Sequence, residues 1–100
     1  KPFAIYTEGD SMINAGIEEG SKVIINPAED VMNGDTGLVC YDGKWYIKWV
    51  VFNPDSSVEL RSANHIYETI RIGKEYAKDE DWFRVIGKVV QIFKKPKSAF

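Results

Sequence analysis

Residues 37–52 read GLVCYDGKWYIKWVVF. The runs on either side of Asp42-Gly43 are rich in the β-branched and aromatic residues that favour strands. An Asp-Gly pair between two such runs is the strongest short-range signal for a β-hairpin. The stretch therefore predicts two antiparallel strands, Gly37–Tyr41 and Lys44–Phe52, and the first of these is apolar on both faces, as a doubly buried strand would be.

The same rhythm of short β-prone runs and turn residues continues in both directions, which is typical of an all-β domain. We expect further strands at Phe3–Glu8, Lys22–Asn26, Val58–Ser62, Ile66–Ile72 and Trp82–Lys94, one helical turn near Met12–Ala15 and a polar loop from Gly73 to Asp81. Gly87 inside the last strand indicates a bulge or a close approach of another backbone. The prediction is a compact, mostly antiparallel β domain of about seven strands over residues 1–94, followed by a loose tail over residues 95–100.

Composition limits the classes of function. One hundred residues with 44% hydrophobic content make one domain with a core. The formal net charge of −2 argues against a domain that grips nucleic acid by itself. No apolar run approaches the length of a membrane helix and no signal peptide is visible, so we expect a cytoplasmic protein without membrane contact. The chain begins with Lys1, which leads us to expect a fragment of something longer.

Two residues suggest chemistry. Ser11 lies in the turn-forming stretch Gly9-Asp10-Ser11-Met12, and Lys48 is the one charged residue inside the apolar run from Trp45 to Val51. A serine activated by a lysine general base is a known variant of the Ser-His-Asp arrangement. Gly-Asp-Ser is also a common turn sequence, so each feature alone has an ordinary structural explanation. Together they predict a Ser-Lys dyad that needs no cofactor and no metal.

Lysine acts as a base only when it is neutral, and its ordinary pKa is about 10.4. Burial among apolar side chains without an adjacent carboxylate lowers that pKa. On a strand, Lys48 shares one face with Tyr46 and Val50, while Ile47 and Trp49 lie on the other. Neither face suits water, so the sequence predicts a buried Lys48 with a lowered pKa.

The residues beside Ser11 are expected to support it. Gly9 allows a sharp turn that projects the Ser11 hydroxyl into a cleft, with Asp10 and Met12 completing the turn. The same turn can aim backbone N–H groups, that of Ser11 included, at a developing oxyanion.

The run EGDSMINAGIEEG at residues 8–20 resembles the nucleophile segment of the LexA and lambda-repressor self-cleaving domains, and it closely resembles that of UmuD. Further stretches resemble later parts of these domains, namely Asn33–Asp35, Asp42–Lys48, Val58–Leu60, Asn64–Tyr67 and Ile86–Val90. The resemblance implies the LexA C-terminal fold, with Ser11 as nucleophile and Lys48 as base. It also implies a homodimer that cuts a peptide bond in its own upstream linker.

The resemblance further implies segments that this chain does not contain. A helix-turn-helix domain and the cleavage linker would precede Lys1, so DNA binding would come only through that missing domain. A recombinase filament on single-stranded DNA is the co-protease of such proteins in the SOS response. Asn14 and Trp49 depart from the family pattern, where proline and a basic residue are frequent, and Trp49 weakens the case for that co-protease.

Alternatives remain open. The fold can serve purely as a dimerisation module with a silent dyad, or the chain can be a UmuD-like polymerase accessory subunit. A type I signal peptidase also uses a Ser-Met motif and a lysine base, but no membrane anchor and only a short Ser11–Lys48 spacing are present. His65, the single histidine, lies near Ser62, yet a triad also needs an orienting acid. Cys40 lies in an apolar run and is expected to be a core residue.

Overall fold

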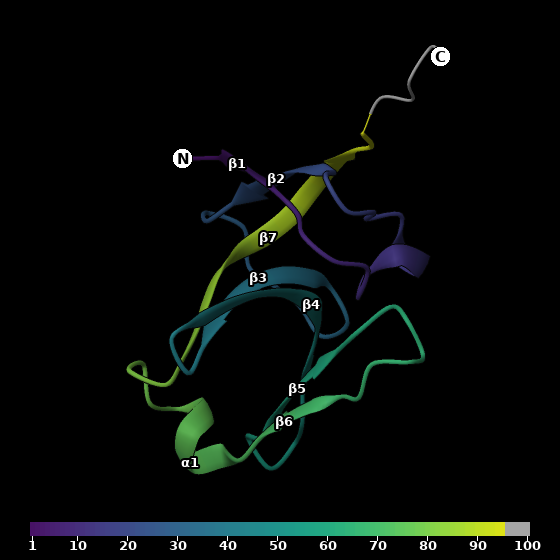
Figure 1. Cartoon of the computed structure of the whole chain (residues 1–100). Coiled ribbons are helices and arrows are strands. Elements are labelled where there is room, and N and C mark those ends of the chain that lie inside the picture. The colour runs from purple at the N-terminus through teal and green to yellow at the C-terminus, as the bar shows by residue number, and fades with distance from the viewer. Residues whose placement is uncertain (96–100) are drawn as a thin grey trace, which may run out of the picture.

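The computed structural model describes residues 1–95. Seven strands form one sheet in the order β1-β2-β7-β3-β4-β5-β6, and every neighbouring pair is antiparallel (Figure 1). The strands are β1 (Phe3–Tyr6), β2 (Lys22–Asn26), β3 (Thr36–Tyr41), β4 (Lys44–Phe52), β5 (Val58–Arg61), β6 (Ile70–Ile72) and β7 (Phe83–Phe93). A 3-10 turn, η1 (Ile13–Ala15), follows β1, and a short helix, α1 (Lys74–Ala77), precedes β7. The prediction of an all-β, mostly antiparallel fold of about seven strands is confirmed.

The β3–β4 hairpin forms where the sequence predicts it. Tyr41 pairs with Lys44, and the two turn residues between them, Asp42 and Gly43, have φ angles of 50° and 74°. A two-residue hairpin loop of this kind requires positive φ at both positions, which Asp-Gly accepts at low cost. The turn fixes the register of β4 and therefore the side of the strand from which Lys48 projects.

Three elements differ from expectation by more than one residue at an end. The first strand ends at Tyr6 instead of Glu8, and the strand expected over Ile66–Ile72 is confined to its last three residues. The strand expected from Ile66 is shorter because Ile66 belongs to a turn in which the Asn64 side chain accepts a hydrogen bond from the Ile66 N–H. The expected loop between Gly73 and Asp81 contains α1. The C-terminal tail, apart from Lys95, lies outside the described residues.

Two clusters of buried side chains form the core. The first cluster comprises Met12, Ile17, Val23, Ile25, Leu38 and Ala63, and the second comprises Val39, Val50, Val58, Leu60, Ile72 and Phe83. Strand β4 contributes to both: Ile47 and Trp49 pack against the first cluster, whereas Val50 belongs to the second and Tyr46 packs against it. Lys48 therefore lies in a strand that packs against apolar side chains on both of its faces.

Gly87 confirms the expected close approach in β7. A Cβ atom at Gly87 would lie 2.8 Å from Cγ2 of Ile25 and 2.9 Å from the carbonyl oxygen of Asn26. Beside it, the register between β3 and β7 shifts by one residue, since Leu38 pairs with Gly87 but Val39 pairs with Val85. None of the helices within residues 1–95 has the length and apolar character that crossing a membrane requires.

Candidate functional site

One cavity brings together residues that are far apart in the sequence. Its volume is about 680 Å³, and it is lined by the loop after β1, by β4 and by the segment that follows β5. All the site residues expected from the sequence line it, namely Gly9, Asp10, Ser11, Met12 and Lys48. Two polar residues that were not expected, Ser62 and Tyr67, line it as well. Figure 1 shows the loop after β1 and the loop between β5 and β6 approaching each other at one side of the sheet.

The loop that carries Ser11 is a turn, not an extended segment. Gly9 has a φ of 76°, a conformation that glycine adopts without strain. Met12 is buried, and its sulfur accepts a hydrogen bond of 3.2 Å from the Ala63 N–H. The Asn14 N–H in turn donates to the Ala63 carbonyl at 2.8 Å. Met12 thus anchors the turn to the segment after β5, while Ser11 stays partly exposed at the cavity wall.

Asp10 is held by the same segment. The Tyr67 hydroxyl donates a hydrogen bond to the Asp10 carboxylate, and the Asn64 amide donates to the Asp10 carbonyl at 3.0 Å. The bond to Asp10 raises the pKa of Tyr67, because a phenol that donates to a carboxylate resists losing its proton. Ser11 therefore follows a residue fixed at both its backbone and its side chain.

Lys48 has the properties that the sequence predicts. Only 7% of the residue is exposed, and desolvation by burial lowers its pKa below the ordinary value. Within residues 1–95 it forms no ion pair with a carboxylate. Its ammonium lies 5.6 Å from the centre of the Tyr67 ring, an arrangement that favours the charged form.

The hydrogen-bond partner of Lys48 was not expected. Nζ of Lys48 donates to Oγ of Ser62 at 2.7 Å, and no hydrogen bond joins Lys48 to Ser11 in the described part of the chain. In the sequence, Ser62 is notable only as a neighbour of His65, which is exposed in the structure. The register of the β4–β5 hairpin could have identified Ser62 as the partner of Lys48. Trp49 pairs with Arg61, so the next residues along the two strands, Lys48 and Ser62, face each other.

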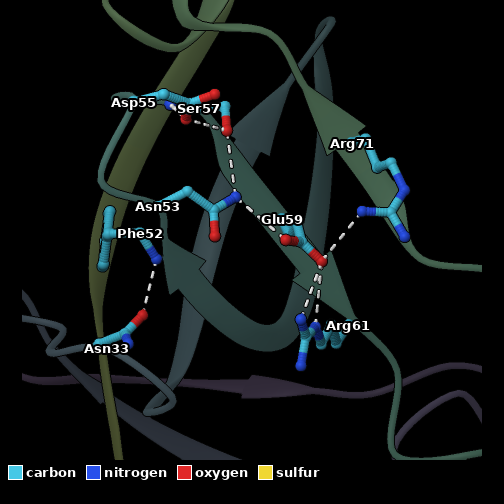
Figure 2. Close-up of polar contacts among 8 residues, drawn as sticks. All are labelled: Asn33, Phe52, Asn53, Asp55, Ser57, Glu59, Arg61 and Arg71. Atoms are coloured by element: carbon cyan, nitrogen blue, oxygen red, sulfur yellow. Dashed lines mark hydrogen bonds and ion pairs between the residues drawn. The ribbon is translucent and has the colours of Figure 1, made fainter.

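A cluster of polar side chains around Glu59 secures that hairpin (Figure 2). The Asn53 amide donates to the Glu59 carboxylate and to the Ser57 hydroxyl, both at 3.0 Å. Arg61 and Arg71 reach the same carboxylate at 3.0 and 3.3 Å. The Asn53 bond above all, and then the arginines, lower the pKa of Glu59. The cluster joins the turn, β5 and β6, and so holds the register that sets Ser62 opposite Lys48.

The cavity also contains acidic groups. Three carboxylates line the cavity, those of Glu8, Asp10 and Glu68. Among residues 1–95, no group of three or more His, Cys, Asp or Glu side chains is placed to hold a metal ion. Cys40 is partly buried in β3 and does not line the cavity.

Known proteins are similar to most of this chain. The family model described as Peptidase S24-like matches residues 1–90. The chain is similar to the LexA repressor of Oleidesulfovibrio alaskensis, with 36% identity over 90% of this chain and 41% of the relative. It is also similar to the LexA repressor of Desulfatibacillum aliphaticivorans, with 35% identity over 93% of this chain and 44% of the relative. The chain thus spans less than half the length of these curated relatives.

Proposed function

The chain belongs to the Peptidase S24-like family, and on that premise we propose that it is the self-cleaving and dimerising domain of a LexA-like or prophage-type transcriptional repressor. In this proposal Ser11 is the nucleophile and Lys48 is the general base. The supporting observation is that both residues line one cavity, where Lys48 is buried, has a lowered pKa and has no carboxylate partner among residues 1–95.

The chemistry follows from the groups present. The neutral Lys48 amine takes the proton from the Ser11 hydroxyl while Oγ attacks the carbonyl carbon of the scissile peptide bond. The negative charge then develops on the carbonyl oxygen, where backbone N–H groups of the turn around Gly9, Asp10 and Met12 can stabilise it. The Lys48 ammonium returns its proton to the departing amine. Water, deprotonated by the same amine, then hydrolyses the ester on Ser11 and restores both residues.

The proposed substrate is a peptide bond in a linker that precedes this domain in the whole protein. A helix-turn-helix domain ahead of that linker would bind DNA, and two copies of the present domain would pair the repressor into a homodimer. A recombinase filament on single-stranded DNA is the proposed co-protease, and the cytoplasm is the proposed location. No cofactor or metal takes part in the proposed reaction.

One observation favours a second candidate. Lys48 donates to Ser62 and not to Ser11, so the dyad does not share a hydrogen bond in this conformation. A domain kept only for dimerisation, with a silent dyad, would be compatible with that arrangement, as would a UmuD-like polymerase accessory subunit. The accessory subunit lacks a helix-turn-helix domain, so the length of the whole protein distinguishes it.

The test uses the full-length protein. It is incubated at pH 7 and at about pH 10, near the pKa of free lysine, and the products are weighed by mass spectrometry. We expect a single cut upstream of this domain, faster at pH 10 because more Lys48 is neutral, and no cut in Ser11→Ala or Lys48→Ala. An intact protein under both conditions, with a recombinase filament added as well, would rule out the peptidase and leave the dimerisation module.

A further inference from the structure

Ser62 is the residue in direct contact with Lys48, and the fold places it there by strand pairing. It follows β5 immediately and faces Lys48 one step beyond the Trp49–Arg61 pair. The 2.7 Å distance between Nζ and Oγ is that of a strong hydrogen bond with a charged donor. Ser62 is partly buried and lines the same cavity as Ser11.

The direction of this hydrogen bond matters for a lysine base. When Lys48 loses its proton, the amine keeps two N–H donors and gains one lone pair. A bond from one N–H to Ser62 restricts the rotation of the amine about its terminal bond and leaves the other two directions to the lone pair and the second N–H. The lone pair is then free to face the cavity, where it can meet the Ser11 hydroxyl. Without Ser62, the amine of a flexible side chain would rotate freely and present the lone pair for only part of the time.

We propose that Ser62 is a positioning residue for the Ser11–Lys48 reaction, orienting the Lys48 amine toward Ser11. This role rests on the proposed function of the dyad. Ser62 exchanges no proton with the substrate in this role and acts through Lys48. The mechanism therefore involves three side chains, one from the loop after β1, one from β4 and one from the end of β5.

A positioning effect of Ser62 can be separated from its effect on the pKa of Lys48, because removal of the hydroxyl changes the cleavage rate in opposite directions through the two. Ser62 accepts a bond from the ammonium, which stabilises the charged form, so removal of the hydroxyl lowers the pKa of Lys48 further. The substitution leaves the other titratable groups that line the cavity in place, namely Tyr6, Tyr46, Tyr67, Glu8, Asp10 and Glu68. A lower pKa alone would speed cleavage at pH 7, whereas loss of positioning slows it even where Lys48 is fully neutral.

The experiment measures the cleavage rate of the full-length protein from pH 6 to pH 11 for the parent, Ser62→Ala and Ser62→Thr. We expect Ser62→Ala to lower the alkaline plateau rate by about ten- to a hundredfold, the effect of losing one hydrogen bond to a charged or reacting group. Ser62→Thr keeps the hydroxyl and should restore most of the rate. Ser56→Ala is the matched control, because Ser56 is an exposed serine of the β4–β5 turn outside the cavity.

A second readout does not depend on activity. In the Ser11→Ala background, which stays intact, NMR titration of the Lys48 Cε signal gives its pKa, and Ser62→Ala should lower it. Equal plateau rates for the parent and Ser62→Ala would overturn the positioning role while leaving the dyad in place. An unchanged pKa would overturn the contact on which the role is based. Absence of cleavage by the parent at every pH would overturn the proposed function and the positioning role together.

Discussion

The buried amine of Lys48 should reduce the stability of the domain at neutral pH. Its folded-state pKa is lowered by desolvation, so the unfolded chain binds the proton more tightly than the folded one. The free energy of unfolding therefore rises as pH increases from the folded pKa toward the unfolded value near 10.4. Below that interval, the desolvation penalty is present in full.

Replacing Lys48 by methionine removes this penalty and keeps an apolar stem of similar length. We expect Lys48→Met to be as stable as the parent at pH 7, or more stable by up to about 1 kcal/mol, and the difference to shrink toward pH 10. Urea unfolding at both pH values measures it, with the exposed Lys44→Met on the same strand as control. A variant clearly less stable than the parent at pH 7 would contradict a desolvated lysine.

The charged carboxylate of Glu59, unlike the charged amine of Lys48, should stabilise the domain. Its pKa is lowered by Asn53, Arg61 and Arg71, so its contribution to stability is present above the unfolded-state pKa of about 4.3 and is lost as pH falls through the folded-state pKa. We expect Glu59→Gln to lower the urea midpoint at pH 7 and to match the parent once Glu59 is protonated in both states. Glu80→Gln, at an exposed position, should change neither value. A difference in urea midpoint between Glu59→Gln and the parent that stays the same at acidic pH would show that packing, and not charge, is responsible.

At the scale of elements, β7 depends on the absence of a side chain at Gly87. A Cβ atom there would meet Ile25 and the backbone of Asn26 and Pro27 at 2.8–2.9 Å, and backbone cannot move aside easily. We expect Gly87→Ala to destabilise the domain by about 1–3 kcal/mol through overpacking between β2 and β7. Thermal unfolding measures the loss. Gly73→Ala is the control, because nothing lies within 4 Å of a Cβ at Gly73 and its φ is −61°.

The elements that the sequence predicted well are those with strong local signals. The bounds of β4 were correct because Asp42-Gly43 fixes one end and Asn53-Pro54 the other. The strand expected from Ile66 failed because Ile66 and Tyr67, both β-prone, are exposed and belong to a turn organised by Asn64. Helix α1 was missed because its four residues contain no buried side chain and no side-chain cap.

At the scale of the whole molecule, the site combines local and non-local information. The turn at Ser11 and the apolar setting of Lys48 are readable from neighbouring residues, and the family resemblance predicted that they would meet. The contacts from Ser62, Asn64 and Tyr67 were not predicted, because they depend on how a later loop folds back over the cavity. Of these three residues, only Ser62 could have been predicted, because the register of the β4–β5 hairpin places it opposite Lys48.

The place of β7 in the sheet bears on how the protein is made. The β1–β2 hairpin carries Ser11 in its loop, and in the sheet it meets the strands that carry Lys48 only through β7, the last strand in the chain. While the ribosome is still adding residues before Phe83, the sheet that would hold the two halves of the proposed dyad together is incomplete. The sheet that supports the proposed dyad is therefore completed last, when β7 has left the ribosome.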